Sequence, residues 1–308
     1  MSIWIGIDEV GYGPKLGPMV LGLYSLHGSS FNDNFWNESS VESDPRKWKD
    51  QLVVCDSKEL YKSQSGIKRL ETSAQVLGQS ANTFFTWLKL SDDLLLDEIK
   101  QYPWYSDDFT IPLEAHPDTI VSHQYKYHKA LNRRDVRPGP VLIRPVLERR
   151  FNSMLKSHNK SRLEFEVIMK MLDHAMLLCP GEHFYVDVDK LGGRDYYSEI
   201  LGTYYPMEDI QIVSESRQMA HYKLPNKNLD IRFSKGADRF SFTVAAASIL
   251  AKYSRELFMK NLNRYWCEKI HGLQATAGYP EDAKRFMYVV KPQLLAAGYS
   301  ENWMVREK

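Results

Sequence analysis

The first eighteen residues constrain the fold more than any other stretch of the chain. Isoleucine occupies every second position of residues 3–7, which is typical of a buried strand, and glycine and proline follow within a few positions. The strand therefore ends by presenting Asp8 and Glu9. Adjacent side chains in a strand point to opposite faces, so the two acids serve one site only if the chain turns at or just after them. Gly11 and Gly13 permit that turn.

The same stretch also fits an ordinary hairpin. A strand, a Gly/Pro connection and a second strand over residues 19–26 satisfy the pattern. Asp and Gly are common turn residues, so in this interpretation Asp8 and Glu9 have no chemical role. The local sequence leaves both interpretations open.

Composition sets broad limits on the protein. The chain has 308 residues, of which 43% are hydrophobic, enough for a substantial core, and its formal net charge of +1 gives no global attraction to nucleic acid. Its three cysteines are isolated, which argues against a disulfide framework and against a zinc site. No apolar run is long enough to span a bilayer. We therefore expect a cytoplasmic protein with no membrane association, and a monomer, since nothing demands a partner subunit.

Periodicity predicts further elements along the chain. After the first hairpin, residues 82–90 form a third strand in this interpretation, which indicates an antiparallel start. A helix followed by a strand occurs twice between residues 163 and 213, which indicates parallel α/β winding in the second half. The predicted helices cover residues 67–77, 120–130, 163–178, 195–201, 241–262 and 281–297, and the strands of the second half cover residues 183–189 and 210–213.

The middle of the chain, at about residues 101–160, has the least regular pattern. Six arginines lie between Arg133 and Arg150, which fits either a phosphate-contacting arm or a solvated insertion with partnered arginines. We favour the insertion. The expected organisation is a single catalytic domain over residues 1–308, with this insertion and a helical C-terminal part at about residues 263–308.

Four acids stand out by position, and they are Asp8, Glu9, Asp187 and Asp238. Clustered carboxylates repel, so holding them together requires cations, and oxygen ligands without nearby His or Cys suggest Mg²⁺ or Mn²⁺. Each acid also has a structural alternative. Asp238 can be the N-cap of the long helix that follows. Asp187 and Asp189 share one face of their strand, and periodicity does not choose between them.

Four motifs resemble those of ribonuclease HII, the type 2 ribonuclease H family. They are Asp8-Glu-Val-Gly-Tyr-Gly-Pro14, Asp56-Ser-Lys58, Tyr185-Val-Asp187-Val-Asp189, and Gly236-Ala-Asp238 followed by Ala245-Ala-Ala-Ser-Ile-Leu-Ala-Lys252. The resemblance covers most of the first ninety residues and most of residues 163–297. It implies an α/β, RNase H-like fold, in which helices flank a five-stranded mixed sheet and a helical C-terminal extension follows.

The resemblance also implies roles for single residues. Asp8, Glu9, Asp187 and Asp238 match the family's metal-binding catalytic acids, with Asp187 chosen because it is the first acid reached in its strand. Substrate-binding positions match at the loop Gly11-Tyr12-Gly13, at Lys58 and at Tyr279. The family has Arg or Lys between the two glycines, so Tyr12 departs from the pattern; it either stacks on the substrate or packs as a loop aromatic. Lys58 and Tyr279 have ordinary alternatives, as a solvated lysine and a turn aromatic, and Lys252 either contacts phosphate or merely flanks Ala251.

The implied function is a metal-dependent endoribonuclease with Mg²⁺ or Mn²⁺. It cuts RNA in RNA–DNA hybrids, or ribonucleotides embedded in duplex DNA, and leaves 3′-hydroxyl and 5′-phosphate ends. Two alternatives remain at this point. One is a divergent member that binds hybrids or junctions without cleavage, and the other is a metal nuclease with altered specificity, such as for DNA junctions.

Overall fold

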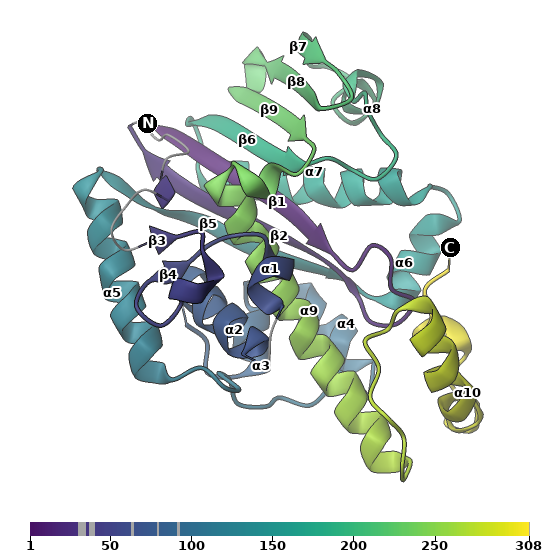
Figure 1. The fold of residues 1–308 in the computed structure, drawn as a ribbon. Helices are drawn as coiled ribbons and strands as arrows, with labels where there is room; N and C mark the ends of the chain where they lie inside the picture. The colour runs from purple at the N-terminus through teal and green to yellow at the C-terminus, as the bar shows by residue number, and fades with distance from the viewer. Residues whose placement is uncertain (30–34, 37–40, 63–64, 79, 91–92, 308) are drawn as a thin grey trace.

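The protein is built around one mixed β-sheet (Figure 1). The computed structural model describes residues 1–29, 35–36, 41–62, 65–78, 80–90 and 93–307. Among them, the sheet has seven strands in the order β5-β2-β1-β6-β9-β8-β7. In that order the strands are Val136–Val146, Met19–Gly28, Ser2–Val10, His183–Asp189, Leu229–Ser234, Met219–Leu224 and Gln211–Glu215. The expected α/β class is confirmed, but the expected number of five strands is wrong, because β8 and β7 extend the sheet beyond β9.

Strand direction changes at β1. On one side, β2 pairs antiparallel with β1, and β5 pairs antiparallel with β2. On the other side, β6 runs parallel to β1 and β9 runs parallel to β6. The last two strands are antiparallel again. The predicted parallel winding of the second half is therefore correct for β6 and wrong for β7, which returns through the hairpin with β8.

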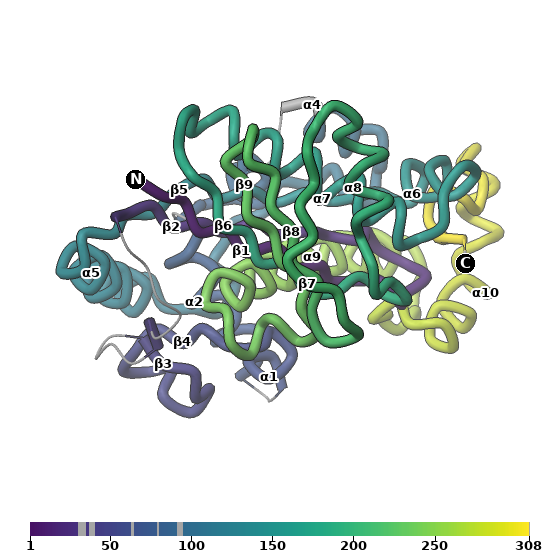
Figure 2. Tube along the Cα trace, turned by 90° about the horizontal axis from the view of Figure 1, so that it is seen from above, coloured from purple at the N-terminus to yellow at the C-terminus, as the bar shows by residue number. Residues whose placement is uncertain are grey.

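Helices cover both faces of the sheet, and each face has its own apolar core (Figure 2). One core contains the odd-numbered side chains of β1 with α7 and α8, and the other contains β2 side chains with α2, α5, α9 and α10. Helices α5 and α10 lie at opposite ends of the molecule in both views. The helices are α1 Ser57–Tyr61, α2 Gly66–Leu77, α3 Phe84–Leu88, α4 Asp93–Lys100, α5 Pro117–Arg133, α6 Glu148–Leu155, α7 Lys160–Leu178, α8 Ser198–Tyr204, α9 Phe242–Lys269 and α10 Pro280–Ala296.

Strand β1 packs against the long helix α9 at unusually close range. Gly6 faces the first turn of α9, and a Cβ placed on it would lie 2.0 Å from the carbonyl carbon of Thr243 and 2.1 Å from the nitrogen of Val244. Only glycine permits that approach. Because Asp8 lies two residues further along the same face, the contact fixes Asp8 relative to the start of α9.

The predicted strand over residues 82–90 is wrong. Residues Phe84–Leu88 form helix α3, whose N-terminus has a capping box between Thr83 and Thr86. The aromatic residues that suggested a strand instead place Phe84 and Trp87 in the core against α9, where the Trp87 indole donates a hydrogen bond to Ser254. The third antiparallel strand is β5, which comes from the middle of the chain.

The middle segment contributes to the central sheet as well as to the surface. Helix α5 agrees with the helix predicted at residues 120–130, and β5 then forms the edge of the sheet beside β2. Prolines at positions 138, 140 and 145 remove backbone donors from β5, which an edge strand tolerates. Part of the segment expected to be an insertion, residues 136–146, thus forms a strand of the central sheet.

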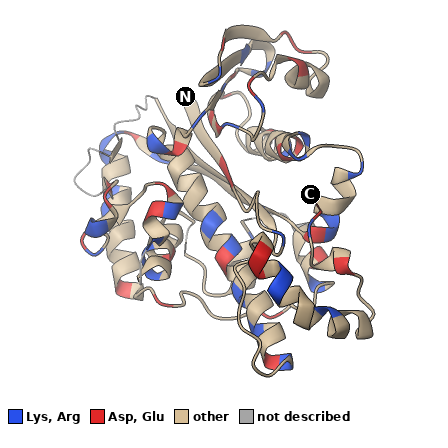
Figure 3. Ribbon diagram, turned by 45° about the vertical axis from the view of Figure 1, so that its right-hand side comes forward, with Lys and Arg blue, Asp and Glu red and all other residues tan. Residues whose placement is uncertain are grey.

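Charged residues are spread over the molecule. Basic and acidic positions alternate over the helices rather than forming one charged region (Figure 3), as the net charge of +1 suggests. Within the described residues, no helix combines the length and apolarity needed to cross a bilayer. Any attraction to a polyanion must therefore be local.

Replacing Gly6 by alanine tests the contact between β1 and α9. We expect Gly6→Ala to lower the free energy of unfolding by about 3 kcal/mol or more, because its Cβ overlaps backbone atoms that cannot rotate away. The matched control is Gly202→Ala in α8, where the nearest atom to the new Cβ, Ile210 Cδ1, is 3.7 Å away. That change adds about 0.5 kcal/mol through helix propensity. Urea unfolding followed by circular dichroism measures both, and equal midpoints would contradict the contact.

Candidate active site

Asp8 and Asp189 lie side by side near the C-terminal ends of β1 and β6. The parallel register pairs Gly6 with Asp187 and Ile7 with Val188, so Asp8 and Asp189 occupy the next position on each strand. Both lie on the face of the sheet that α9 covers. The Ala237 N–H donates a 2.9 Å hydrogen bond to Asp189 Oδ1, which joins the end of β6 to the turn before α9.

Asp238 belongs to that turn. Gly236 adopts a left-handed φ of 68°, and Ala237–Arg239 form one 3₁₀ turn before α9 begins. Ser241, not Asp238, occupies the N-cap position of α9. The helix-capping alternative for Asp238 is therefore wrong, and its carboxylate lies beside those of the strand ends.

The carboxylates raise one another's pKa values. Burial raises the pKa of Asp8 well above its ordinary value, and the charges of Glu9, Asp189 and Asp238 add to the effect. Burial and the charge of Asp189 raise the pKa of Glu9 to about 7. The pKa of Asp238 is raised by burial and then by the charges of Asp56 and Asp189. These shifts identify Asp8, Glu9, Asp189 and Asp238 as one electrostatic group, called the acid cluster below.

A fifth acid, Glu164 of α7, approaches the cluster from the other face of the sheet. Its side chain is only 2% exposed, and its Oε2 atom has no hydrogen-bond partner within the described structure. Burial and the charges of Glu9 and Asp189 raise its pKa well above the ordinary value. Glu164 therefore adds to the repulsion that the cluster must overcome.

Asp187 does not join the acid cluster. Its two carboxylate oxygens accept hydrogen bonds of 2.7 and 2.9 Å from Nε and Nη2 of Arg232 on β9. This bidentate pair lies in a separate hollow of about 270 Å³ that Trp4, Tyr185 and His221 also line. Asp187, which was chosen as the first acid in its strand, is therefore paired with Arg232. Asp189 is the acid of β6 that lies beside Asp8.

Cationic neutralisation of the cluster is limited. Among the described residues, no Lys or Arg forms an ion pair with the carboxylates of Asp8, Glu9, Asp189 or Asp238. The charge of Lys58 lowers the pKa values of Glu9 and Asp238, which places its ammonium group nearby. All four side chains offer hard carboxylate oxygens, a donor type that suits a divalent cation such as Mg²⁺ or Mn²⁺. Within the described part of the chain, no group of three or more His, Cys, Asp or Glu side chains is placed so that it could hold a metal ion.

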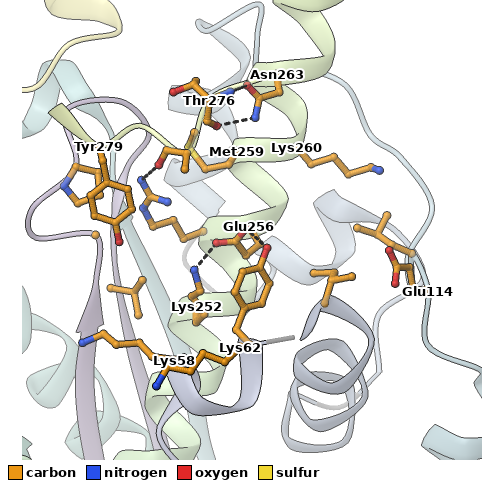
Figure 4. A pocket seen from close by; sticks show the side chains of 18 residues that line it. Lys58, Lys62, Glu114, Lys252, Glu256, Met259, Lys260, Asn263, Thr276 and Tyr279 are labelled. Carbon is orange, nitrogen blue, oxygen red and sulfur yellow. Dashed lines mark hydrogen bonds and ion pairs between the residues drawn. The ribbon is translucent and has the colours of Figure 1, made fainter. Parts of the chain in front are cut away.

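A cleft of about 780 Å³ opens beside the acid cluster (Figure 4). Helix α9 forms its back wall through Lys252, Glu256 and Lys260, and Lys58 of α1 approaches from below in the view. Tyr279, at the N-terminus of α10 and 59% exposed, lines the opposite side from Glu114. The predicted substrate residues Lys58 and Tyr279 therefore face one cleft, together with Gly11.

Lys252 is held in place within the cleft. Its ammonium group donates a 2.5 Å hydrogen bond to Glu256 and lies 4.4 Å from the centre of the Tyr61 ring. The Tyr61 hydroxyl donates to the other oxygen of Glu256 at 3.0 Å. The side chain of Lys252 is thus oriented before any ligand arrives, and it does not simply flank Ala251.

The Gly11-Tyr12-Gly13 loop divides its residues between two environments. Gly11 has a φ of 98°, and a Cβ there would lie 2.7 Å from Arg255 Nε, whereas a Cβ on Gly13 would meet nothing within 4 Å. Tyr12 packs away from the cleft, against Gly192 and under Lys160, whose Nζ lies 5.3 Å from the ring centre. Of the two roles considered for Tyr12, the structure favours packing.

Sequence reasoning considered Asp189 but chose Asp187, and it missed Glu164 and Arg255 entirely. Asp189 had a signal, because carboxyl ends of adjacent parallel strands meet at one edge, and that rule favours the last acid of β6 over the first. Glu164 had no such sequence signal, because its position in α7 matches the polar face of an amphipathic helix. Arg255 is 4% exposed, and only the tertiary structure shows that it donates to the Leu16 carbonyl.

Comparison with known proteins gives one family match. Residues 206–293 match the model of the ribonuclease HII family. The expected resemblance is confirmed over that segment, which contains Asp238, Lys252 and Tyr279 but not Asp8, Glu9 or Asp189. No curated protein matches the chain significantly.

Solved structures of ribonucleases H align with most of the chain. In the PCNA:RNase HII complex from Archaeoglobus fulgidus, the alignment covers 99% of this chain and 94% of the other, with 18% identity and a TM-score of 0.45. For ribonuclease H2 from Pyrococcus horikoshii OT3 the shares are 98% and 92%, with 14% identity and a TM-score of 0.43. For Bst-RNase HIII in complex with Mn²⁺ they are 99% and 66%, with 14% identity and a TM-score of 0.41.

Neutralising one acid tests the repulsion within the cluster. A carboxyl whose pKa is raised by folding binds its proton more tightly in the folded state, so stability is lost as the pH rises from its unfolded value through its folded value, about 7 for Glu9. We therefore expect Asp8→Asn, without divalent ions at pH 8, to raise the free energy of unfolding by about 1–2 kcal/mol. The gain should shrink towards pH 5.

Urea unfolding at both pH values measures this difference. Asp209→Asn, an exposed acid outside the cluster, is the control and should change stability by less than about 0.5 kcal/mol. A destabilised Asp8→Asn protein at pH 8 would show that repulsion does not dominate the site.

Proposed function

We propose that this protein is a metal-dependent endoribonuclease that hydrolyses RNA in RNA–DNA hybrids or ribonucleotides embedded in duplex DNA. The observation that carries the proposal is the acid cluster at the ends of β1 and β6, beside a cleft lined by Lys58, Lys252 and Tyr279. The match of residues 206–293 to the ribonuclease HII family supports it independently.

The acid cluster would hold the divalent ions. Asp8, Glu9, Asp189 and Asp238 supply only carboxylate oxygens, and the raised pKa values of Asp8, Glu9 and Asp238 indicate that a neutralising partner, either a proton or a cation, is favoured there. Bound Mg²⁺ or Mn²⁺ supplies activation of water and stabilisation of charge on the phosphate and the leaving oxygen. Hydrolysis then gives 3′-hydroxyl and 5′-phosphate ends.

The cleft would hold the nucleic acid. Lys58 would provide positive charge for backbone phosphates next to the acids, and Lys252, whose ammonium group is paired with Glu256, would add an oriented hydrogen-bond donor. Tyr279 presents an exposed ring that can pack against a sugar. These residues lie on three separate segments, so a substrate in the cleft contacts α1, α9 and the start of α10 together.

Ribose would be recognised by the backbone of the glycine loop. A protein distinguishes RNA from DNA through the 2′-hydroxyl, which both donates and accepts hydrogen bonds. Within the described residues, no protein acceptor takes a hydrogen bond from the N–H groups of Tyr12 and Gly13. The open space around Gly13 lets a substrate oxygen approach this backbone closely. With Tyr12 packed against Gly192, the loop offers no cation of its own, and Lys58 provides the nearby charge.

Cleavage of labelled duplexes tests the function directly. The substrates contain one ribonucleotide, a run of four or none, each in Mg²⁺ and in Mn²⁺. We expect cutting only where ribose is present, because the loop backbone reads the 2′-hydroxyl, and at least about 100-fold less in Asp8→Asn. Binding without cutting would indicate a binding protein, and cutting of the all-DNA duplex a nuclease of different specificity.

A pair of variants tests which acid of β6 serves the site. We expect Asp189→Asn to reduce cleavage by about 100-fold or more, since it removes a carboxylate beside Asp8. Asp187→Asn should reduce it by less than about tenfold, because Asp187 is engaged by Arg232. Circular dichroism confirms that both variants fold. The reverse order of effects would restore Asp187 to the site.

A further inference from the structure

The glycine loop is held in place by the last residues of the described chain. Arg306 is 1% exposed, and its Nη2 atom donates to the carbonyl oxygens of both Gly11 and Pro14. Its backbone N–H donates a further bond of 2.8 Å to Lys15 O. In return, Lys15 Nζ donates to Arg306 O at 3.1 Å. Arg306 therefore contacts Gly11 of the loop and the two residues that follow the loop, Pro14 and Lys15.

The C-terminal segment is itself anchored. The Asn152 side chain on α6 donates to Val305 O at 2.8 Å and accepts from Glu307 N–H at 2.8 Å, so it holds both neighbours of Arg306. The guanidinium of Arg306 also lies 4.9 Å from the centre of the Phe151 ring. Arg306 thus reaches the loop from a fixed backbone.

The backbone carbonyls and N–H groups around the loop differ in their partners. The carbonyls of Gly11 and Pro14 accept hydrogen bonds from the buried Arg306. The N–H groups of Tyr12 and Gly13 have no protein acceptor among the described residues. A second buried arginine, Arg255, donates to Leu16 O at 3.0 Å and limits the space at Gly11. With the Gly11 and Pro14 carbonyls bound by Arg306, the N–H groups of Tyr12 and Gly13 remain available to a substrate oxygen.

We infer that Arg306 is a positioning residue, which fixes the backbone of the Gly11-Tyr12-Gly13 loop so that it can recognise the ribose of the substrate. The inference rests on the proposed function and adds a residue nearly three hundred positions away from the loop. Arg306 touches neither the acid cluster nor the cleft, so it acts only through the loop.

Arg306→Ala, Arg306→Lys and a control variant test the inference. The control is Arg149→Ala. The Arg149 guanidinium lies 3.9 Å from the centre of the Trp303 ring, so it also contacts the C-terminal segment, but within the described structure it makes no hydrogen bond to a carbonyl of the loop. On the single-ribonucleotide duplex, we expect Arg306→Ala to lower kcat/KM by about 10- to 100-fold, mainly through kcat, because small displacements of positioning groups cost that much. Arg306→Lys should recover part of the loss, as should added guanidinium ion with Arg306→Ala. Arg149→Ala should match the wild type.

Backbone amide exchange provides a readout that does not depend on activity. Mass spectrometry of a peptide covering residues 11–18 should show exchange at least about tenfold faster in Arg306→Ala, with α9 unchanged. Unchanged exchange in this peptide, or exchange that rises equally in α9, would overturn the positioning role. If the wild type fails to cut any ribose-containing duplex, the proposed function falls, while the exchange result still decides whether Arg306 holds the loop.

Discussion

The closeness of β1 to α9 at Gly6 determines how the rest of the site is arranged. Because no side chain separates the strand from the first turn of the helix, Asp8 and the turn that bears Asp238 come together. The parallel pairing of β1 with β6 adds Asp189 from the next strand. Three segments far apart in the sequence thus supply one cluster, and the backbone of each is held by regular secondary structure rather than by a loop alone.

The repulsion and burial of the clustered carboxylates cost folding free energy, which the surrounding fold must offset. Glu164 and Asp56 add charge to the cluster, and the positive charges of Lys58 and Arg239 offset it in part. The two apolar cores on either side of the sheet supply the stability that such an arrangement requires. Buried acids whose pKa values are raised by burial and by one another's charges are more common at functional sites than elsewhere.

Much of this fold could be predicted from local sequence patterns. Alternation gives β1 and β6, and helical spacing gives α2, α5, α7, α9 and α10, because in each case burial on one face dominates the choice of residues. Prediction failed where other forces decide. β5 contains prolines that a central strand excludes, and only its position at the sheet edge makes them acceptable. The aromatic residues of α3 favour a strand by propensity, but the capping box and packing against α9 override that preference.

The residues of the candidate site could also be predicted only in part. Asp8, Glu9 and Asp238 follow from motifs, whereas the choice between Asp187 and Asp189 depends on strand register, which no local pattern specifies. Arg306 carries no local signal at all, since its partner Gly11 lies 295 positions away. That separation has a consequence for folding. Closing so long a stretch of chain costs conformational entropy, so we expect the glycine loop to acquire its final shape only after the sheet and the helices have brought both ends together.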